Sequence, residues 1–315
     1  MSKNLLFFII GNICLIAFAY WSRKRKRLNN IVLFCTSTFL ILSIIETFYR
    51  DVVKEKGDYF SKNDRVLGFR PDSILGAQPT QAGQYGSTRL MRSGDTVYHA
   101  LYTVIADSTP NPLPMNHRVG YLAPGAPDPK IFFWGCSFTF GQGVNDSETL
   151  AWRVGALRNV STVNLGQMGY GTNNVYQLFQ KRFAGKSNGK KFFIYTMIPD
   201  HVPRSGGIYD YIAGPAFQIK GDSVVYSGVQ TIPNYRFAHY SSLFGCYSFI
   251  NDMLINIDMN NRNRNMPAEE YRNVYLMIRQ MNHDAITSGG SFLLLFWDIY
   301  NSNTSDPNTY HRPIM

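Results

Sequence analysis

The sequence has little cysteine, four residues among 315. Cys14 and Cys35 fall inside apolar stretches, which leaves only Cys136 and Cys246 for the rest of the chain. That number is too small for a disulfide framework. No Cys-x-x-Cys pair or Cys/His cluster has the spacing of metal ligands, so we predict no metal site. Cys136 is a conceivable thiol nucleophile, but its expected role is that of a small buried side chain.

Motifs for cofactors and nucleic acids are missing as well. Gly141-Gln-Gly143 has neither the lysine of a phosphate loop nor the full dinucleotide fingerprint, so we expect no cofactor. The formal charge of +10 is concentrated in the run from Arg23 to Arg27. From Arg50 onward the chain has 25 basic and 20 acidic residues, an ordinary surface balance that argues against a nucleic-acid-binding protein.

Two apolar stretches flank the basic run, Leu5 to Trp21 and Ile31 to Tyr49. Each is near the lower length limit for a helix that crosses a bilayer. Short loops rich in Lys and Arg stay cytoplasmic, so we predict a transmembrane hairpin over residues 1–49 with a cytoplasmic basic loop. Everything after Arg50 would then lie on the periplasmic side of a bacterial inner membrane. A cleaved signal peptide is the alternative, although its positive cluster would precede the apolar run.

Residues 50–129 predict a spacer and a collar. The stretch from Arg50 to Asp64 is highly charged, which suits a segment that separates a domain from the bilayer. The following part, to Pro129, is irregular and contains many Gly, Gln and Pro residues. Its one alternating stretch, Val97 to Ile105, is typical of a strand. We expect a collar of strand and loop packed on the following domain.

Residues 130–315 alternate between short apolar runs and helical patterns. The predicted strands are Ile131–Trp134, Ser161–Leu165, Lys191–Met197 and Phe292–Trp297; the predicted helices are Leu150–Leu157, capped by Asp146 or Ser147, then Asn173–Phe183, Tyr247–Ile257 and Pro267–Ser288. This alternation predicts an α/β domain with a parallel sheet flanked by helices. An insertion at about 205–265, with a hairpin over Phe217–Tyr226, is expected to cover the active face.

A residue with functional potential follows every predicted strand. Ser137 follows the first, a glycine loop around Gly169 follows the second, Asp200 and His201 follow the third, and Asp298 follows the fourth. The carboxyl ends of parallel strands meet at one edge of a sheet, where ligands bind. We therefore predict one site at this edge.

Three blocks at these strand ends form a pattern: G-C-S-F-T-F-G, N-L-G-Q-M-G-Y-G and I-P-D-H-V-P-R. Together they resemble the SGNH, or GDSL-like, hydrolase superfamily in its membrane-anchored bacterial branch, from about Lys130 to Asp298. The resemblance implies a flavodoxin-like sheet that carries a serine esterase or acyltransferase site. Ser137 would be the nucleophile, and the backbone amides of Ser137 and Gly169 would stabilise the oxyanion. Cys136 stands where the family more often has Asp.

The chain departs from the family pattern in two places. The oxyanion asparagine of the third block is absent, because Pro199 and Asp200 stand there; Asn173 or Asn174 is a possible replacement. No Asp-x-x-His follows the last predicted strand before Met315, so the general base is not identified. We expect that the domain is C-terminally incomplete or works without this block.

The remaining candidates each have a second interpretation. His201 is a possible base or substrate ligand, or a histidine satisfied by the inserted loop. Asp200 belongs to the site or caps a turn, and Arg204 binds substrate or a carboxylate of the protein. Ser137 itself could merely cap a strand-to-helix turn, and Gly169 could be a turn glycine.

Two functions follow from these patterns. The first is a membrane-anchored serine esterase or O-acyltransferase that removes acetyl groups from envelope or extracellular polysaccharide, or transfers them to it. The second keeps the fold without catalysis, as a glycan-binding or assembly subunit of an envelope complex, and the missing base favours it. The aromatic insertion from Tyr209 to Tyr240 could stack on sugar rings. An α/β-hydrolase is excluded, because Thr139 replaces the second glycine of the G-x-S-x-G elbow.

Overall fold

The computed structural model describes residues 13, 17, 20, 26–48, 59–62, 69–72, 74–79, 81–91, 95–106, 115–126, 128–186, 190–207, 214–230 and 267–297. The chain divides into two units. The first contains Met1–Tyr59 and Asn234–Asn261, and the second contains Phe60–Pro233 and Arg262–Met315.

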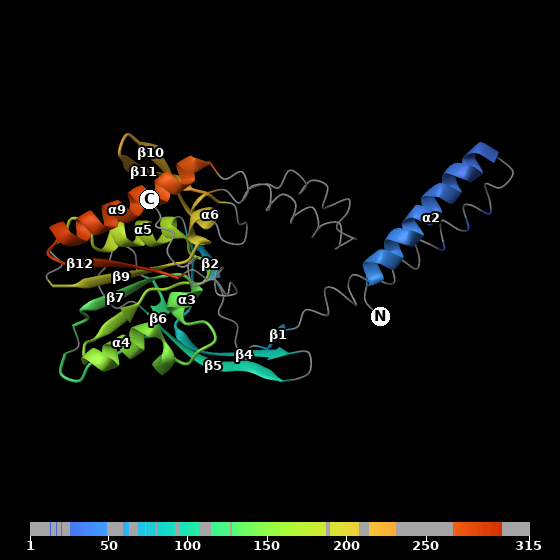
Figure 1. Ribbon diagram of the computed structural model, residues 1–315. Coiled ribbons are helices and arrows are strands. Elements are labelled where there is room, and N and C mark those ends of the chain that lie inside the picture. Colours follow the sequence, from blue (N-terminus) through green and yellow to red (C-terminus); the bar gives the residue numbers. More distant parts are fainter. Residues whose placement is uncertain are drawn as a thin grey trace, which may run out of the picture. The chain divides into compact units, whose positions relative to one another are not determined.

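The first unit is represented mainly by helix α2, Lys26–Phe48 (Figure 1). Lys26 and Arg27, which the sequence predicted to lie in a loop, belong to this helix. Among the described residues, no helix combines the length and the apolar character needed to cross a membrane. The hairpin predicted for residues 1–49 is therefore not supported. Most of its first span lies outside the described residues.

An eight-stranded mixed sheet organises the second unit, in the order β1-β4-β5-β6-β8-β7-β9-β12 (Figure 1). The strands are β1 Tyr59–Lys62, β4 Gly83–Met91, β5 Thr96–Ile105, β6 His117–Arg118, β7 Ile131–Gly135, β8 Thr162–Asn164, β9 Phe192–Met197 and β12 Ser291–Phe296. Strands β8, β7, β9 and β12 are parallel, whereas β4, β5 and β6 join them antiparallel. The predicted α/β class is confirmed.

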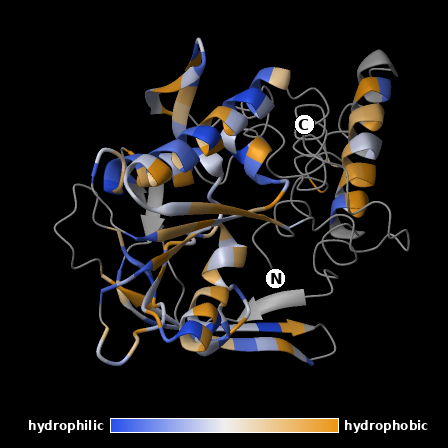
Figure 2. Cartoon of the chain, turned by 60° about the vertical axis from the view of Figure 1, so that its left-hand side comes forward, coloured by the Kyte–Doolittle hydropathy of each residue, from blue (hydrophilic) through white to orange (hydrophobic). Residues whose placement is uncertain are grey.

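Helices cover both faces of the parallel strands (Figure 1). Helix α4, Leu150–Arg158, lies against β7 and β8 on one face, and α5, Thr172–Arg182, packs with α9, Ala268–Thr287, on the other. The strands between them carry mainly hydrophobic residues (Figure 2). The main core lies under α5 and α9, where rings of β7 and β9 meet rings at the end of α5; its members include Trp134, Phe179, Phe183, Phe193 and Tyr195.

The predicted collar is part of the main sheet rather than a layer packed on it. Of its strands, the sequence predicted only β5. Strand β4 pairs with β5 antiparallel, with Tyr85 opposite Tyr102, and both side chains are buried. The sequence gives no strand signal for β4, because this strand contains glycines and a glutamine. Its stability comes from the ladder with β5 and not from its own propensity. A separate ribbon of β2, Phe69–Asp72, and β3, Gly76–Pro79, was also not predicted.

The start of α4 differs from the prediction. Thr149 is the N-cap residue, and its hydroxyl accepts a hydrogen bond from the Trp152 backbone N–H at 3.2 Å. Asp146 and Ser147 lie instead in a preceding one-turn 3₁₀ helix, Asp146–Glu148. The carboxylate of Asp146 is not a cap for α4, because it binds a buried arginine described below.

The predicted hairpin in the insertion is confirmed as β10, Pro215–Lys220, paired with β11, Ser223–Val229. Gly221, at φ 63°, takes the first central position of the turn, as in a type II′ turn. The hairpin packs on α5 and α9, with the Phe217 ring edge-on to Tyr176 at 5.1 Å. The helix predicted for Tyr247–Ile257 lies outside the described residues.

Gly135 ends β7 at φ 151°, in a region that favours glycine. A Cβ atom at this position would lie 2.6 Å from the carbonyl oxygen of Thr196 on β9. We therefore expect Gly135→Ala to lower the free energy of unfolding by about 3 kcal/mol, measured by urea denaturation. Gly125→Ala is the control, because φ is 73° there but, apart from its chain neighbours, no described residue has an atom within 4 Å of the added Cβ. Equal losses in the two variants would contradict this account.

Candidate functional site

Ser137 opens a one-turn helix, α3 (Ser137–Phe140), directly after β7. Thr139 and Phe140 are buried, so the exposed half of this helix consists of Ser137 and Phe138. The Ser137 side chain is partly exposed, and its hydroxyl makes no hydrogen bond to any described residue. Cys136, just before it, is fully buried.

The position of Ser137 in the sheet follows from the strand order. β7 lies between β8 and β9, and the chain passes from β7 first to β8 and then across to β9. The connections after β7 and β8 therefore run in opposite directions, which opens a crevice at the carboxyl edge. Ser137 stands at this switch point.

A buried arginine fixes the segment that follows α3. Arg118 on β6 is fully buried, and its guanidinium binds the Asp146 carboxylate at 2.9 Å. It also donates to four backbone carbonyl oxygens, those of Leu101, Phe140, Gly141 and Val144. Burial lowers the pKa of Arg118 below its ordinary value, and the hydrogen bond to Asp146 offsets only part of this effect.

The Tyr102 and Phe140 rings complete the surroundings of the Arg118 guanidinium, at 4.5 and 5.0 Å from its central carbon. These contacts, together with the hydrogen bonds, tie α3 and the following loop to the antiparallel strands.

The glycine loop after β8 is joined to the same helix. Asn164, at the end of β8, donates its amide to the Thr139 carbonyl oxygen at 2.9 Å and accepts the Gly166 N–H at 3.1 Å. Gly166 packs so closely on α3 that a Cβ atom would lie 2.6 Å from the Thr139 Cβ. The Gln167 N–H donates to the Gly135 carbonyl oxygen at 3.0 Å. The loop is thus anchored to the turn that carries Ser137.

Gly169 lies in this loop at φ 80°, a conformation that favours glycine. It is partly exposed, and its N–H has no acceptor among the described residues. An oxyanion donor needs both properties. Its neighbour Tyr170 is fully buried.

Asn173 and Asn174, the possible replacement donors, are both buried at the start of α5. The amide nitrogen of Asn173 donates to the Pro215 carbonyl oxygen at 2.8 Å, and that of Asn174 donates to Leu75 at 2.7 Å. Both side chains thus join the helix to neighbouring segments. In the described part of the chain, neither side chain is hydrogen-bonded to Ser137.

His201 begins α6 (His201–Ser205) and is fully buried. Its Nδ1 shares a hydrogen bond of 2.7 Å with the Tyr195 hydroxyl, which also bonds Thr172 at 2.8 Å. The imidazole stacks on the Tyr195 ring, and its buried Nε2 has no hydrogen-bond partner among the described residues. Burial, assisted by the nearby Arg204 charge, lowers the pKa of His201 to about 3. The ring is neutral, and no hydrogen bond joins it to Ser137.

Asp200 and Arg204 form an ion pair at 3.5 Å across one turn of α6. Arg204 also donates to the Tyr170 carbonyl oxygen at 3.2 Å. The pair therefore connects the segment after β9 with the glycine loop after β8. This is one of the two roles expected for Arg204 from the sequence, the binding of a protein carboxylate.

The structure adds Arg118 and Asn164 as residues that build the site. Arg118 lies in a stretch that looks irregular in the sequence, and no local pattern marks it. Asn164 lies inside the quoted second block, but its role depends on a contact with α3 that sequence spacing does not reveal.

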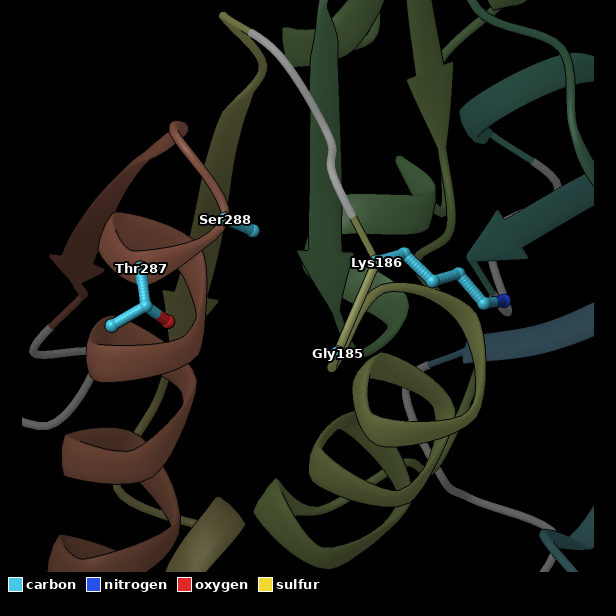
Figure 3. A pocket seen from close by; sticks show the side chains of 4 residues that line it. All are labelled: Gly185, Lys186, Thr287 and Ser288. Carbon is cyan, nitrogen blue, oxygen red and sulfur yellow. The ribbon is translucent and has the colours of Figure 1, made fainter.

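A surface pocket of about 300 Å³ lies elsewhere, between the ends of α5 and α9 (Figure 3). Its lining segments lead into β9 and β12, so it lies at the amino edge of these strands, opposite Ser137. The Lys186 side chain points away from Thr287 and donates to the Arg182 carbonyl oxygen at 2.9 Å. The Lys186 ammonium therefore caps α5. In the described residues, no group of His, Cys, Asp and Glu side chains could hold a metal ion.

Comparison with known proteins gave no match: no family model, curated protein or solved structure is significantly similar to the chain. The family resemblance of the three blocks therefore stays a prediction from the sequence.

Removing the Arg118 guanidinium should destabilise the fold around Ser137. Arg118→Met leaves Asp146 without its cation and removes one donor from each of four carbonyl oxygens. We expect a loss of about 3–5 kcal/mol in the free energy of unfolding, measured by urea denaturation. Arg153→Met, at an exposed position on α4, should change it by less than about 0.5 kcal/mol. A loss below about 1 kcal/mol for Arg118→Met would contradict the proposed role.

The neutral state of buried His201 predicts a pH dependence of stability. Its pKa is about 3 in the folded chain and about 6.5 when unfolded, so the unfolded chain binds more protons between these values. Stability attributable to His201 is complete above about pH 6.5 and falls with decreasing pH, by up to about 1.4 kcal/mol per pH unit. Urea denaturation from pH 7 to pH 5 should show a smaller slope for His201→Gln than for the wild type. His283→Gln, an exposed position, should keep the wild-type slope.

Proposed function

We propose that the α/β unit is a serine esterase or O-acyltransferase that acts on acylated polysaccharide. The observation that carries the proposal is the position of Ser137: a partly exposed hydroxyl without a hydrogen-bond partner among the described residues, at the switch point of a parallel sheet. The turn that holds it is rigid, because Arg118 and Asn164 bind the end of α3.

The reaction would begin with attack of the Ser137 Oγ on an ester carbonyl carbon, while the hydroxyl proton passes to a base. The carbonyl oxygen would become an oxyanion that accepts hydrogen bonds from the backbone N–H groups of Ser137 and Gly169. Such donors are worth about 3 kcal/mol each. Collapse of this intermediate breaks the bond to the sugar oxygen, which takes the proton from the base and leaves as a hydroxyl, and an acyl-enzyme remains. Water then gives hydrolysis, and a second sugar hydroxyl gives transfer.

The base is the incomplete part of this scheme. His201 is neutral, but its Nδ1 is engaged by Tyr195 and the imidazole is buried away from solvent. No base for Ser137 is identified among the described residues. His201 would serve only after a rearrangement that brings its unpaired Nε2 to Ser137.

Two further observations support the proposal. The parallel strands β7, β8, β9 and β12 are arranged in the order 2-1-3-4, which is that of flavodoxin-like sheets. The three sequence blocks that resemble the SGNH superfamily all follow strands of this set. The periplasmic location rests on the sequence alone, and the reaction does not depend on it.

A specific observation favours the alternative, a glycan-binding or assembly subunit without catalysis. Within the described residues, neither an imidazole nor a carboxylate is hydrogen-bonded to Ser137. A serine hydroxyl without a base is a poor nucleophile.

The test is hydrolysis of p-nitrophenyl acetate by the full chain, with fluorophosphonate labelling of the nucleophile. We expect Ser137→Ala to lower kcat/KM at least 100-fold and to abolish labelling of the peptide that contains residue 137. Ser147→Ala is the matched control, because Ser147 is exposed in the 3₁₀ helix before α4 and should behave like the wild type. Cys136→Ala separately tests the thiol.

Equal rates for the wild type and Ser137→Ala, with no labelled peptide, would reject the enzyme. Binding of an acetylated oligosaccharide by both proteins would then favour the alternative function.

A further inference from the structure

Phe138, in the exposed half of α3, forms an aromatic pair with Trp297. The rings of Phe138 and Trp297 meet edge to face, with centroids 5.7 Å apart and an interplanar angle of 84°. Both remain open to solvent, with exposed fractions of 41% for Phe138 and 36% for Trp297. Large aromatic side chains usually bury most of their surface, so an exposed pair beside a candidate nucleophile suggests contact with a ligand.

The pair lies at the same edge of the sheet as Ser137. Phe138 is the next residue of α3, and Trp297 follows β12, where its N–H donates to the Met197 carbonyl oxygen at 2.8 Å. The end of β9, with Met197 and Ile198 buried, lies between the two strands that supply the rings. The aromatic pair therefore extends from α3 across the end of β9 to β12.

The glycine loop with Gly169 lies on the other side of Ser137 from the aromatic pair. It follows β8, which neighbours β7 on the side away from β9 and β12. Along the carboxyl edge the order is thus the loop with Gly169, then Ser137, then the aromatic pair. An ester whose carbonyl oxygen points to the loop would direct another part of the substrate towards Phe138 and Trp297.

We infer that Phe138 and Trp297 bind a sugar ring of the substrate, an inference that rests on the proposed function. An acetyl group has only two carbons and can be enclosed at the nucleophile, whereas the polysaccharide must stay at the surface. The pair is exposed and uncharged, and aromatic rings of this kind suit the apolar C–H face of a neutral pyranose.

The test compares two acetyl esters of different size with the full chain. Acetylated xylo-oligosaccharides carry sugar rings, and ethyl acetate carries none. We expect Phe138→Ala and Trp297→Ala each to lower the ratio of kcat/KM for the oligosaccharide to kcat/KM for ethyl acetate about tenfold, as for other stacked rings. Tyr275→Ala, an exposed aromatic position on α9, should keep the wild-type ratio.

Binding is measured separately by calorimetry with Ser137→Ala, alone and combined with each aromatic substitution. Oligosaccharide binding that is lost with the pair, without turnover by the wild type, would reject the proposed function and retain the sugar site. Turnover with an unchanged ratio would reject the sugar site and retain the enzyme. Neither turnover nor binding would reject both.

One measurement needs no aromatic substitution and is therefore independent of any folding defect. Acetylated xylo-oligosaccharide should protect Trp297 from oxidation by N-bromosuccinimide in the wild type, read by mass spectrometry. Unchanged oxidation at saturating oligosaccharide would contradict the sugar site.

Discussion

The burial of one guanidinium, that of Arg118, is the constraint on which the candidate site depends. A buried cation is costly unless it is paired and fully hydrogen-bonded. Arg118 meets this condition with one carboxylate and four carbonyl oxygens, and two of the carbonyls belong to Phe140 and Gly141 at the end of α3. A helix end leaves such carbonyls unpaired, and a cation there is favourable. The same interaction thus stabilises the arginine and the turn of Ser137.

The antiparallel strands have a larger part in the site than their place at the end of the sheet suggests. Arg118 on β6 is the register partner of Asn164 on β8, and both side chains bind carbonyl oxygens of α3. The candidate nucleophile Ser137 directly follows the parallel strand β7. Its helix α3 is kept in place by Arg118 on β6 and Asn164 on β8. A site on a rigid strand end still needs such support to keep its geometry.

The sequence predicts the parallel half of the fold well and the site only partly. Strands such as Ile131–Gly135 are continuous apolar runs, and α9 begins after a proline and ends before two glycines, so local signals suffice. Strand β4 has no such signal, because its ladder with β5 is a long-range interaction. Ser137 and Gly169 follow from strand ends. The buried state of His201 does not, because it depends on side-chain contacts in the folded chain, with Tyr195 six residues earlier and, through it, with Thr172.

The Arg118 contacts also limit how this architecture can change. Four of its five partners lie within the short stretch from Phe140 to Asp146, each at a fixed position around one planar group. An insertion there would displace at least one acceptor, so this loop cannot change in length without losing a hydrogen bond to the Arg118 guanidinium. Related chains with larger or smaller substrates would have to vary elsewhere, in the segments after β9 or β12. The burial of one side chain thus fixes the length of the segment from Phe140 to Asp146.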